Sequence, residues 1–339
     1  MRAISDPLVD DPAKGAEAET PRRRRMSMSE GALQTLVLFG FLVAIAVFFT
    51  SRDANFLTGR NALNILVNAS VIGIVSLGQA FALISGGFDL SVGGIVPLGG
   101  VSFALLVNHG YSVPVAVVLV LALGAVCGLI NGLLIARARI NPLIATLGTL
   151  SVTGGLALSL ANGVQVPFVD VTDGVLTRRA LFGINNHVWI FLGLAVLVFL
   201  ILRFTSYGRQ LYAVGGNKQA ARLAGIRVDL VTVSVYVASG ALAALAGAVL
   251  ASQLLTGSGT AGTTSGLQSI TAVILGGASL AGGVGGVPGT VIGVLILGAL
   301  ANGMAILSVP SFYQTMATGV VLLVAVGISQ FRSTRRAAS

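Results

Sequence analysis

The sequence is short of charge. Only 9% of its 339 residues are Asp, Glu, Lys or Arg, against about 25% in ordinary soluble domains. No glutamate follows Glu30, and Lys14 and Lys218 are the only lysines, whereas hydrophobic residues make up 55% of the chain. Water is therefore the wrong solvent for most of this sequence, which indicates an all-α integral membrane protein.

Cysteine and the motifs of enzymes are also scarce. Cys127 is the single cysteine and lies in an apolar run, which excludes a disulfide framework and a thiolate metal site. The sequence contains neither HExxH nor G-x-S-x-G, and neither lysine stands in the P-loop frame G-x-x-x-x-G-K-[ST]. We therefore predict no catalytic residue and no metal site, and any ATP that powers this protein must bind another chain.

Long apolar runs fill the remainder of the chain. A bilayer core of about 30 Å needs about 20 helical residues to cross it. Ten runs approach that length and are predicted to span: 33–50, 63–84, 92–107, 113–136, 143–161, 188–202, 231–253, 267–280, 287–307 and 312–328.

The net charge is +9, and the arginines that produce it gather between these apolar runs. This placement is typical of the loops of a membrane protein and argues against a nucleic-acid-binding surface. A cytoplasmic N-terminus places the clusters at 22–25, 137–139, 203–227 and 332–336 inside, and leaves only Arg52, Arg60, Arg178 and Arg179 outside. This asymmetry follows the positive-inside rule and predicts that both termini are cytoplasmic.

The same pattern predicts the organisation of the chain. We expect a disordered cytoplasmic tail over 1–30, a transmembrane domain over 31–332 with a cytoplasmic loop at 203–230, and a short cytoplasmic tail over 333–339.

Glycine is abundant, with 45 residues. Gly124, Gly128 and Gly132 form overlapping GxxxG steps, which predict close helix packing. The glycine-rich segments 86–94 and 276–283 resemble each other and each lies between two apolar runs, as in transporters built from duplicated halves. Chance similarity is the alternative, since both segments are short.

A polar stripe runs along the second predicted span at helical spacing, through Asn61, Asn64, Asn68, Ser76 and Gln79. Amides in hydrocarbon are costly unless paired, so this face must meet protein or a water-filled path. Neutral amides both donate and accept hydrogen bonds, which suits an uncharged polyhydroxylated solute. Lining a path and bridging helices are both compatible with the pattern.

Apart from carboxylates in the predicted loops, Asp89 is the one carboxylate inside or next to the apolar runs. Ser91 follows it at a predicted helix start. An intramembrane acid suggests function, but a capping or turn role fits the sequence equally. A proton relay requires several acids or histidines in series. His109 and His187 fall in predicted outer loops, which argues against proton coupling.

The long inner loop contains its own helical pattern. Gly215-Gly216 predicts a turn, Asn217 an N-cap and Gly225 a C-terminal stop, which leaves a basic helix of about two turns between them. Such a helix either lies on anionic lipid or docks into another protein.

Gln219-Ala220-Ala221, followed by Gly225, resembles the EAA-x-x-x-G coupling loop of bacterial ABC importer permeases, with glutamine in place of glutamate. Other segments resemble the ribose/xylose/arabinose branch of these sugar permeases, and the resemblance extends across about residues 55–330. These segments are 86–93, 144–147, 208–209, 212–213, 215–217, 225–226 and 276–283.

This resemblance implies a multi-pass permease of the bacterial inner membrane that imports a monosaccharide, with a pentose favoured. Its expected partners are a second permease copy in a homodimer, a cytoplasmic ABC ATPase, a periplasmic sugar-binding protein and membrane lipid, and no nucleic acid. The chain itself would hold no cofactor, because the ATPase binds ATP and Mg²⁺.

The resemblance assigns the coupling contact to Asn217, Gln219, Ala220, Ala221 and Gly225. For the substrate path the candidates are Asn64, Asn68, Gln79, Asp89 and Ser91. An ion-coupled secondary transporter of a small neutral solute is the alternative, and a membrane structural or regulatory protein is a third class.

Overall fold

The computed structural model describes residues 30–169, 176 and 181–337, with side chains described from 36 to 327. Apart from Glu30, the tail predicted over 1–30 lies outside these residues, as do Arg178 and Arg179 of the predicted outer loop.

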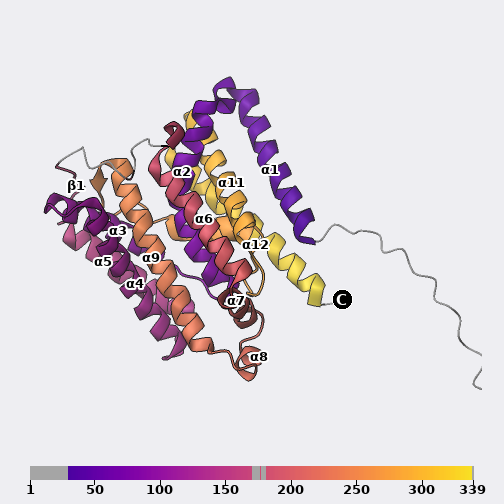
Figure 1. Ribbon diagram of the computed structural model, residues 1–339. Coiled ribbons are helices and arrows are strands. Elements are labelled where there is room, and N and C mark those ends of the chain that lie inside the picture. Colours follow the sequence, from indigo (N-terminus) through magenta and orange to yellow (C-terminus); the bar gives the residue numbers. More distant parts are fainter. Residues whose placement is uncertain (1–29, 170–175, 177–180, 338–339) are drawn as a thin grey trace, which may run out of the picture.

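The described chain is almost entirely helical (Figure 1). Its elements, in order, are α1 (Glu30–Arg52), η1 (Ala54–Leu57), α2 (Gly59–Ile84), α3 (Val92–Asn108), α4 (Val113–Ala136), α5 (Pro142–Leu160), β1 (Val166–Pro167), η3 (Leu181–Gly183), α6 (Asn186–Phe204), α7 (Ser206–Gly216), α8 (Lys218–Leu223), α9 (Val228–Leu254), β2 (Thr256–Gly257), α10 (Ser265–Leu275), α11 (Val287–Ile306) and α12 (Ser311–Ala337).

Each predicted span falls on a helix. In the described part of the chain, six helices are long and apolar enough to cross a membrane: α2, α4, α5, α6, α9 and α11. The other four predicted spans coincide with α1, α3, α10 and α12, whose described apolar portions are shorter. The all-helical membrane architecture is thus confirmed, whereas the count of ten, the cytoplasmic position of the termini and the internal duplication stay predictions.

Helix α9 forms the centre of the bundle and packs along α4, α3 and α2. The α4–α9 contact depends on glycine. A Cβ atom added to Gly128 would overlap the carbonyl oxygen of Tyr236, and one added to Gly124 would overlap that of Gly240. The close packing predicted from the GxxxG steps is therefore confirmed, because only glycine lets these two backbones meet.

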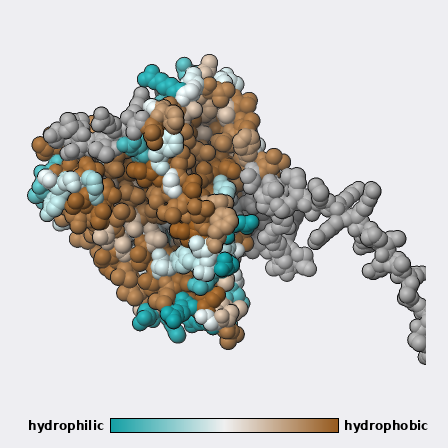
Figure 2. All heavy atoms as spheres, in the orientation of Figure 1, coloured by the Kyte–Doolittle hydropathy of each residue, from teal (hydrophilic) through white to brown (hydrophobic). Residues whose placement is uncertain are grey.

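The outer surface is apolar over much of its height. Exposed Leu, Val, Ile and Phe side chains cover α4, α5 and α6. The face drawn in Figure 2 is broadly hydrophobic, with its most hydrophilic residues toward the periphery. In the most apolar 18-residue stretch of α5, only 22% is buried against the rest of the chain. Such a surface requires lipid or another subunit to cover it.

Most helix ends lie within about four residues of the predicted ends, and three differences have structural consequences. α10 ends at Leu275 instead of 280, because Gly277 turns the chain with a left-handed φ of 97°. α12 continues to Ala337, past the predicted span end at 328. Gly215-Gly216 forms the last residues of helix α7, so the predicted turn begins only at Asn217.

The connections between helices divide between the two ends of the bundle. β1 and β2 pair antiparallel, with Val166 opposite Gly257, at one end. α7 and α8 lie at the opposite end, where the start of α1 and the end of α12 also lie (Figure 1). The bundle therefore presents one face built around a short hairpin and another built around α7 and α8.

Candidate functional site

Helix α7 is firmly attached to the bundle. Its N-terminus is capped by Thr205, whose hydroxyl accepts from the Gly208 N–H at 3.1 Å. Leu211 is fully buried, and the Tyr207 and Ser234 hydroxyls are hydrogen-bonded at 2.8 Å, which links α7 to α9. The Tyr212 hydroxyl donates to the carbonyl oxygen of Gly285 at 2.9 Å. A tyrosine hydroxyl is already protonated at neutral pH, and burial raises the pKa of Tyr212 further, so the hydroxyl remains a donor.

Helix α8 begins and ends as its sequence predicts. The Asn217 Oδ1 atom accepts from the N–H groups of Gln219 at 2.9 Å and Ala220 at 3.0 Å. Gly225 adopts a left-handed φ of 82°, and the next N–H, of Ile226, returns to the Ala221 carbonyl at 3.0 Å. The predicted N-cap and stop are confirmed, and they enclose a helix of 6 residues.

The five predicted coupling residues do not share one environment. Asn217, Gln219, Ala220 and Gly225 are exposed, whereas Ala221 is only 3% exposed and faces the protein. Ala221 thus seats α8 on the bundle, and the other four lie on or next to its outer surface.

Leu223, which the sequence analysis missed, is 91% exposed in the last turn of α8. Leu223 is the one large apolar residue of α8, whose other five residues are Lys218, Gln219, Ala220, Ala221 and Arg222, and that contrast is the signal that could have found it. Leu223 is thus accessible to both kinds of surface that the sequence left open for this helix, anionic lipid and another protein.

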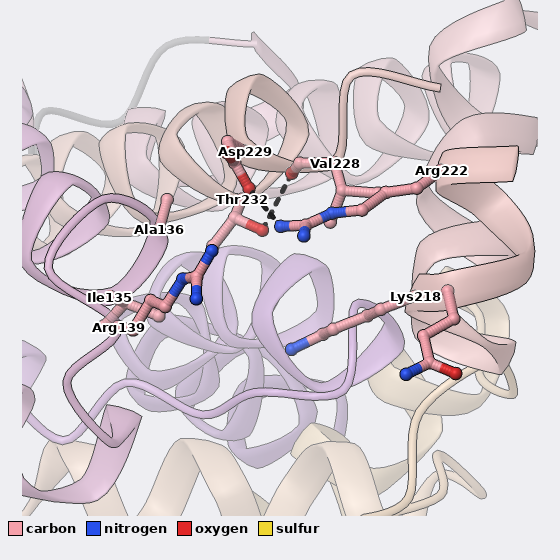
Figure 3. A pocket seen from close by; sticks show the side chains of 9 residues that line it. Ile135, Ala136, Arg139, Lys218, Arg222, Val228, Asp229 and Thr232 are labelled. Carbon is pink, nitrogen blue, oxygen red and sulfur yellow. Dashed lines mark hydrogen bonds and ion pairs between the residues drawn. The ribbon is translucent and has the colours of Figure 1, made fainter. Parts of the chain in front are cut away.

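A basic cavity of about 260 Å³ separates α8 from the ends of α4 and α9 (Figure 3). Arg222 pairs with Asp229 at 2.7 Å across its edge, and both side chains are about half exposed, so this pair stabilises the fold little. Arg139 and Lys218 extend toward the same space (Figure 3). The surface around α8 therefore combines an apolar tip with excess positive charge.

In contrast to the exposed residues of α8, Asp89 is completely buried in the turn between α2 and α3. Its Oδ1 atom accepts from the backbone N–H of Ser91 at 3.0 Å and from the Ser91 hydroxyl at 2.5 Å. The Ser91 oxygen accepts from Nδ2 of Asn131 at 2.8 Å, and Oδ1 of Asn131 accepts from the Thr149 hydroxyl at 2.5 Å. We call these four residues the Asp89 network, and it ties the turn to α4 and α5.

Gln79 completes the enclosure of this turn. In the amide orientation that satisfies both groups, its nitrogen donates to the Asp89 carbonyl at 3.0 Å and its oxygen accepts from the Asp89 N–H at 3.1 Å. Gln79, Asp89 and Ser91 are each 0% exposed. The turn role of Asp89, one of the two interpretations left open by the sequence, is therefore present in the structure.

Asn64 and Asn68, the other two path candidates, are not part of this cluster, because both are exposed on the first half of α2. Asn61 bridges helices instead: its Nδ2 atom donates to Oδ1 of Asn302 at 2.9 Å and to the Phe56 carbonyl at 2.9 Å. The predicted stripe thus divides into a helix bridge, an exposed pair and a buried group.

Comparison with known proteins identifies relatives over most of the chain. The family model for the branched-chain amino acid transport system permease component matches residues 61–326. The ribose import permease protein of Bacillus subtilis (strain 168) is 39% identical over 90% of this chain and 95% of its own length. The L-arabinose ABC transporter permease protein of Azospirillum brasilense is 37% identical over 100% of this chain and 99% of its own.

The xylose transport system permease protein of Haemophilus influenzae (strain ATCC 51907 / DSM 11121 / KW20 / Rd) is 33% identical over 86% of this chain and 95% of its own. No solved structure matches the chain. The extent of these matches and the apolar helices of the bundle lead to one conclusion: the chain is a multi-pass membrane protein that belongs to the family of transport-system permease components.

Proposed function

We propose that this chain is the membrane-spanning permease subunit of an ATP-binding cassette importer for a neutral monosaccharide, with a pentose as the favoured substrate. Three relatives carry ribose, arabinose and xylose in their names. The structural observation that supports the proposal is α8, a capped helix with an exposed leucine that is held to the bundle through α7.

The α8 surface is the proposed docking site for a separate ATPase subunit. Leu223 would enter an apolar pocket of that partner, while Asn217, Gln219, Ala220 and Gly225 lie around it. The nearby Arg139 and Lys218 favour a partner surface with acidic residues. ATP and Mg²⁺ would bind the partner, and this chain would carry no cofactor of its own.

The path is proposed to form between two copies of the chain. Gln79, Asp89 and Ser91 are sealed in the bundle, which argues against a path through the middle of one copy. Asn64 and Asn68 are exposed on a helix long and apolar enough to span a membrane, and amides facing hydrocarbon are costly. A second copy covering this face would place the two amides beside a water-filled path, where they can exchange hydrogen bonds with sugar hydroxyls.

Reconstitution tests this proposal. Vesicles containing the chain, its ATPase subunit and its periplasmic binding protein should take up labelled D-ribose, D-xylose or L-arabinose only when ATP is present. Omitting each component in turn provides the controls. Uptake by the chain alone under an ion gradient would contradict the proposal and support an ion-coupled secondary transporter. No uptake of any of the three sugars with all components present would remove the pentose assignment.

The path has its own test. Asn64→Leu and Asn68→Leu are expected to lower uptake, whereas Asn61→Leu is expected to lower mainly stability, because Asn61 bridges α2 to α11. Equal uptake by wild type and both exposed variants, at equal protein levels, would exclude these amides from the path.

A further inference from the structure

Three segments that are far apart in the sequence meet at the end of the bundle that carries α8. They are the turn after α2 at Gly86, the last residues of α7 at Gly215, and the turn after α10 at Gly282 and Gly283. Together with Ile84 we call these residues the glycine junction. Two of the segments are the mutually similar glycine-rich stretches of the sequence, and α7 lies against both.

Backbone rests directly on backbone at this junction. A Cβ atom added to Gly215 would overlap the carbonyl oxygen of Ile84 and lie 2.6 Å from the Gly283 nitrogen. One added to Gly282 would lie 2.7 Å from both the Gly215 oxygen and the Gly86 Cα. The Gly283 N–H also donates to the Ile84 carbonyl at 2.9 Å. No side chain separates these backbones, so direct contact resists any displacement of one segment toward another.

A second tie between α7 and the α10–α11 turn lies next to the junction. It is the hydrogen bond from the Tyr212 hydroxyl to the Gly285 carbonyl. Tyr212 lies about one helical turn before Gly215 on α7. Helix α7 therefore contacts the α10–α11 connection at two points, one through Tyr212 and one through Gly215.

The junction has a different neighbour on each side. Toward α8, only Asn217 separates Gly216, the end of α7, from Lys218, the start of α8. Toward the membrane domain, Gly86 stands three residues before Asp89, whose network continues into α4 and α5. The junction therefore links α8, through Asn217 and the end of α7, to both the α2–α3 turn and the α10–α11 turn.

We propose that the glycine junction is the positioning element that transfers a displacement of α8 simultaneously to the α2–α3 and α10–α11 turns. This inference rests on the proposed function, since it requires a partner that moves α8. Its consequence is that residues with no contact to sugar or nucleotide determine how much transport each ATP hydrolysis produces.

Adjacent glycines provide a matched test. Gly215→Ala would force the backbones apart, whereas a Cβ atom at Gly216 meets nothing within 4 Å. In vesicles with ATPase and binding protein, the readout is sugar imported per ATP hydrolysed. We expect Gly215→Ala to lower this ratio at least about fivefold, the lower end of ordinary coupling between sites, and Gly216→Ala to leave it unchanged. ATPase copurification should be the same for both variants, because α8 is intact.

Tyr212→Phe provides a second test that adds no atoms to the junction. It removes only the bond to Gly285, and we expect a smaller loss of the same ratio without loss of folded protein. If Gly215→Ala does not fold, Tyr212→Phe decides the question. Ratios equal to that of Gly216→Ala in every folded variant would overturn the inference alone. A wild-type complex that hydrolyses ATP without importing sugar would instead overturn the proposed function, and the inference with it.

Discussion

Asn131 of α4 donates its side-chain amide to the hydroxyl of Ser91, 40 positions earlier in the chain, at 2.8 Å. This bond joins two buried residues and continues through Thr149 of α5. The turn between α2 and α3 is therefore held by neighbouring helices as well as by its own backbone, and this arrangement can be tested one bond at a time.

Thr149→Val should destabilise the folded protein by about 0.6 kcal/mol, and at most about 1.7 kcal/mol, the range for hydrogen bonds between membrane helices. Thr146→Val is the matched control, because the Thr146 hydroxyl bonds only to carbonyls of its own helical turn. Thermal denaturation in detergent, followed by size-exclusion chromatography, measures both. Equal midpoints for the two variants would mean that the bond to Asn131 contributes nothing.

Asp89→Asn and Asp89→Ala should show whether this position requires only a hydrogen-bond acceptor or a carboxyl group. Asparagine keeps an Oδ1 acceptor for the two bonds from Ser91, so we expect it to fold and insert. Alanine leaves the buried Ser91 N–H without its acceptor, which costs about 1–3 kcal/mol. The yield of monodisperse protein and its thermal midpoint check this. A loss as large for asparagine as for alanine would show that a carboxyl group is required.

Gly128→Val should prevent α4 from packing on α9, since even a single Cβ atom would overlap the Tyr236 carbonyl. Gly148→Val on α5 is the control, because a Cβ atom there meets nothing within 4 Å. We expect little or no folded Gly128→Val protein and wild-type yield of Gly148→Val. Fluorescence-detected size-exclusion chromatography of both distinguishes a packing defect from a general effect of valine in a membrane helix.

Gly225→Asp should weaken capture of the ATPase subunit while leaving membrane insertion intact. Gly225 is exposed with open space around it, so the added charge would enter the proposed docking surface and not the bundle. Gly225→Asn is the control, because asparagine tolerates the left-handed backbone and carries no charge. Equal copurification of the ATPase with both variants would count against docking at Gly225.

Leu223→Ala should weaken the same contact. Burial of a leucine side chain contributes about 1.5–3 kcal/mol, so truncation is expected to lower affinity for the ATPase about tenfold or more. Leu230→Ala, on α9 and 53% exposed, provides a control outside α8. Binding of the purified ATPase to the chain in nanodiscs measures the difference. Unchanged affinity for Leu223→Ala would remove this leucine from the interface.

Features governed by local chemistry were predictable from the sequence. Apolar run length located the helices, because a bilayer core requires a nearly fixed number of residues. The cap at Asn217 and the stop at Gly225 depend on atoms within a few residues of each helix end, and both were predicted correctly. The family followed from short motifs that keep their order along the chain.

Features governed by long-range packing were not predictable. The buried position of Ala221 and the exposure of Leu223 depend on how α8 is seated against the bundle. The separation of Asn61, Asn64 and Gln79 depends on which helix covers each part of α2.

The sequence by itself therefore determined a membrane protein of apolar helices and a short capped helix between two of them. The tertiary structure decided which polar side chains are sealed, which are exposed, and that Gly215 touches Ile84 and Gly283. The physical reason is that hydropathy and capping act over one or two helical turns, whereas burial is set by whatever distant segment packs on the same face.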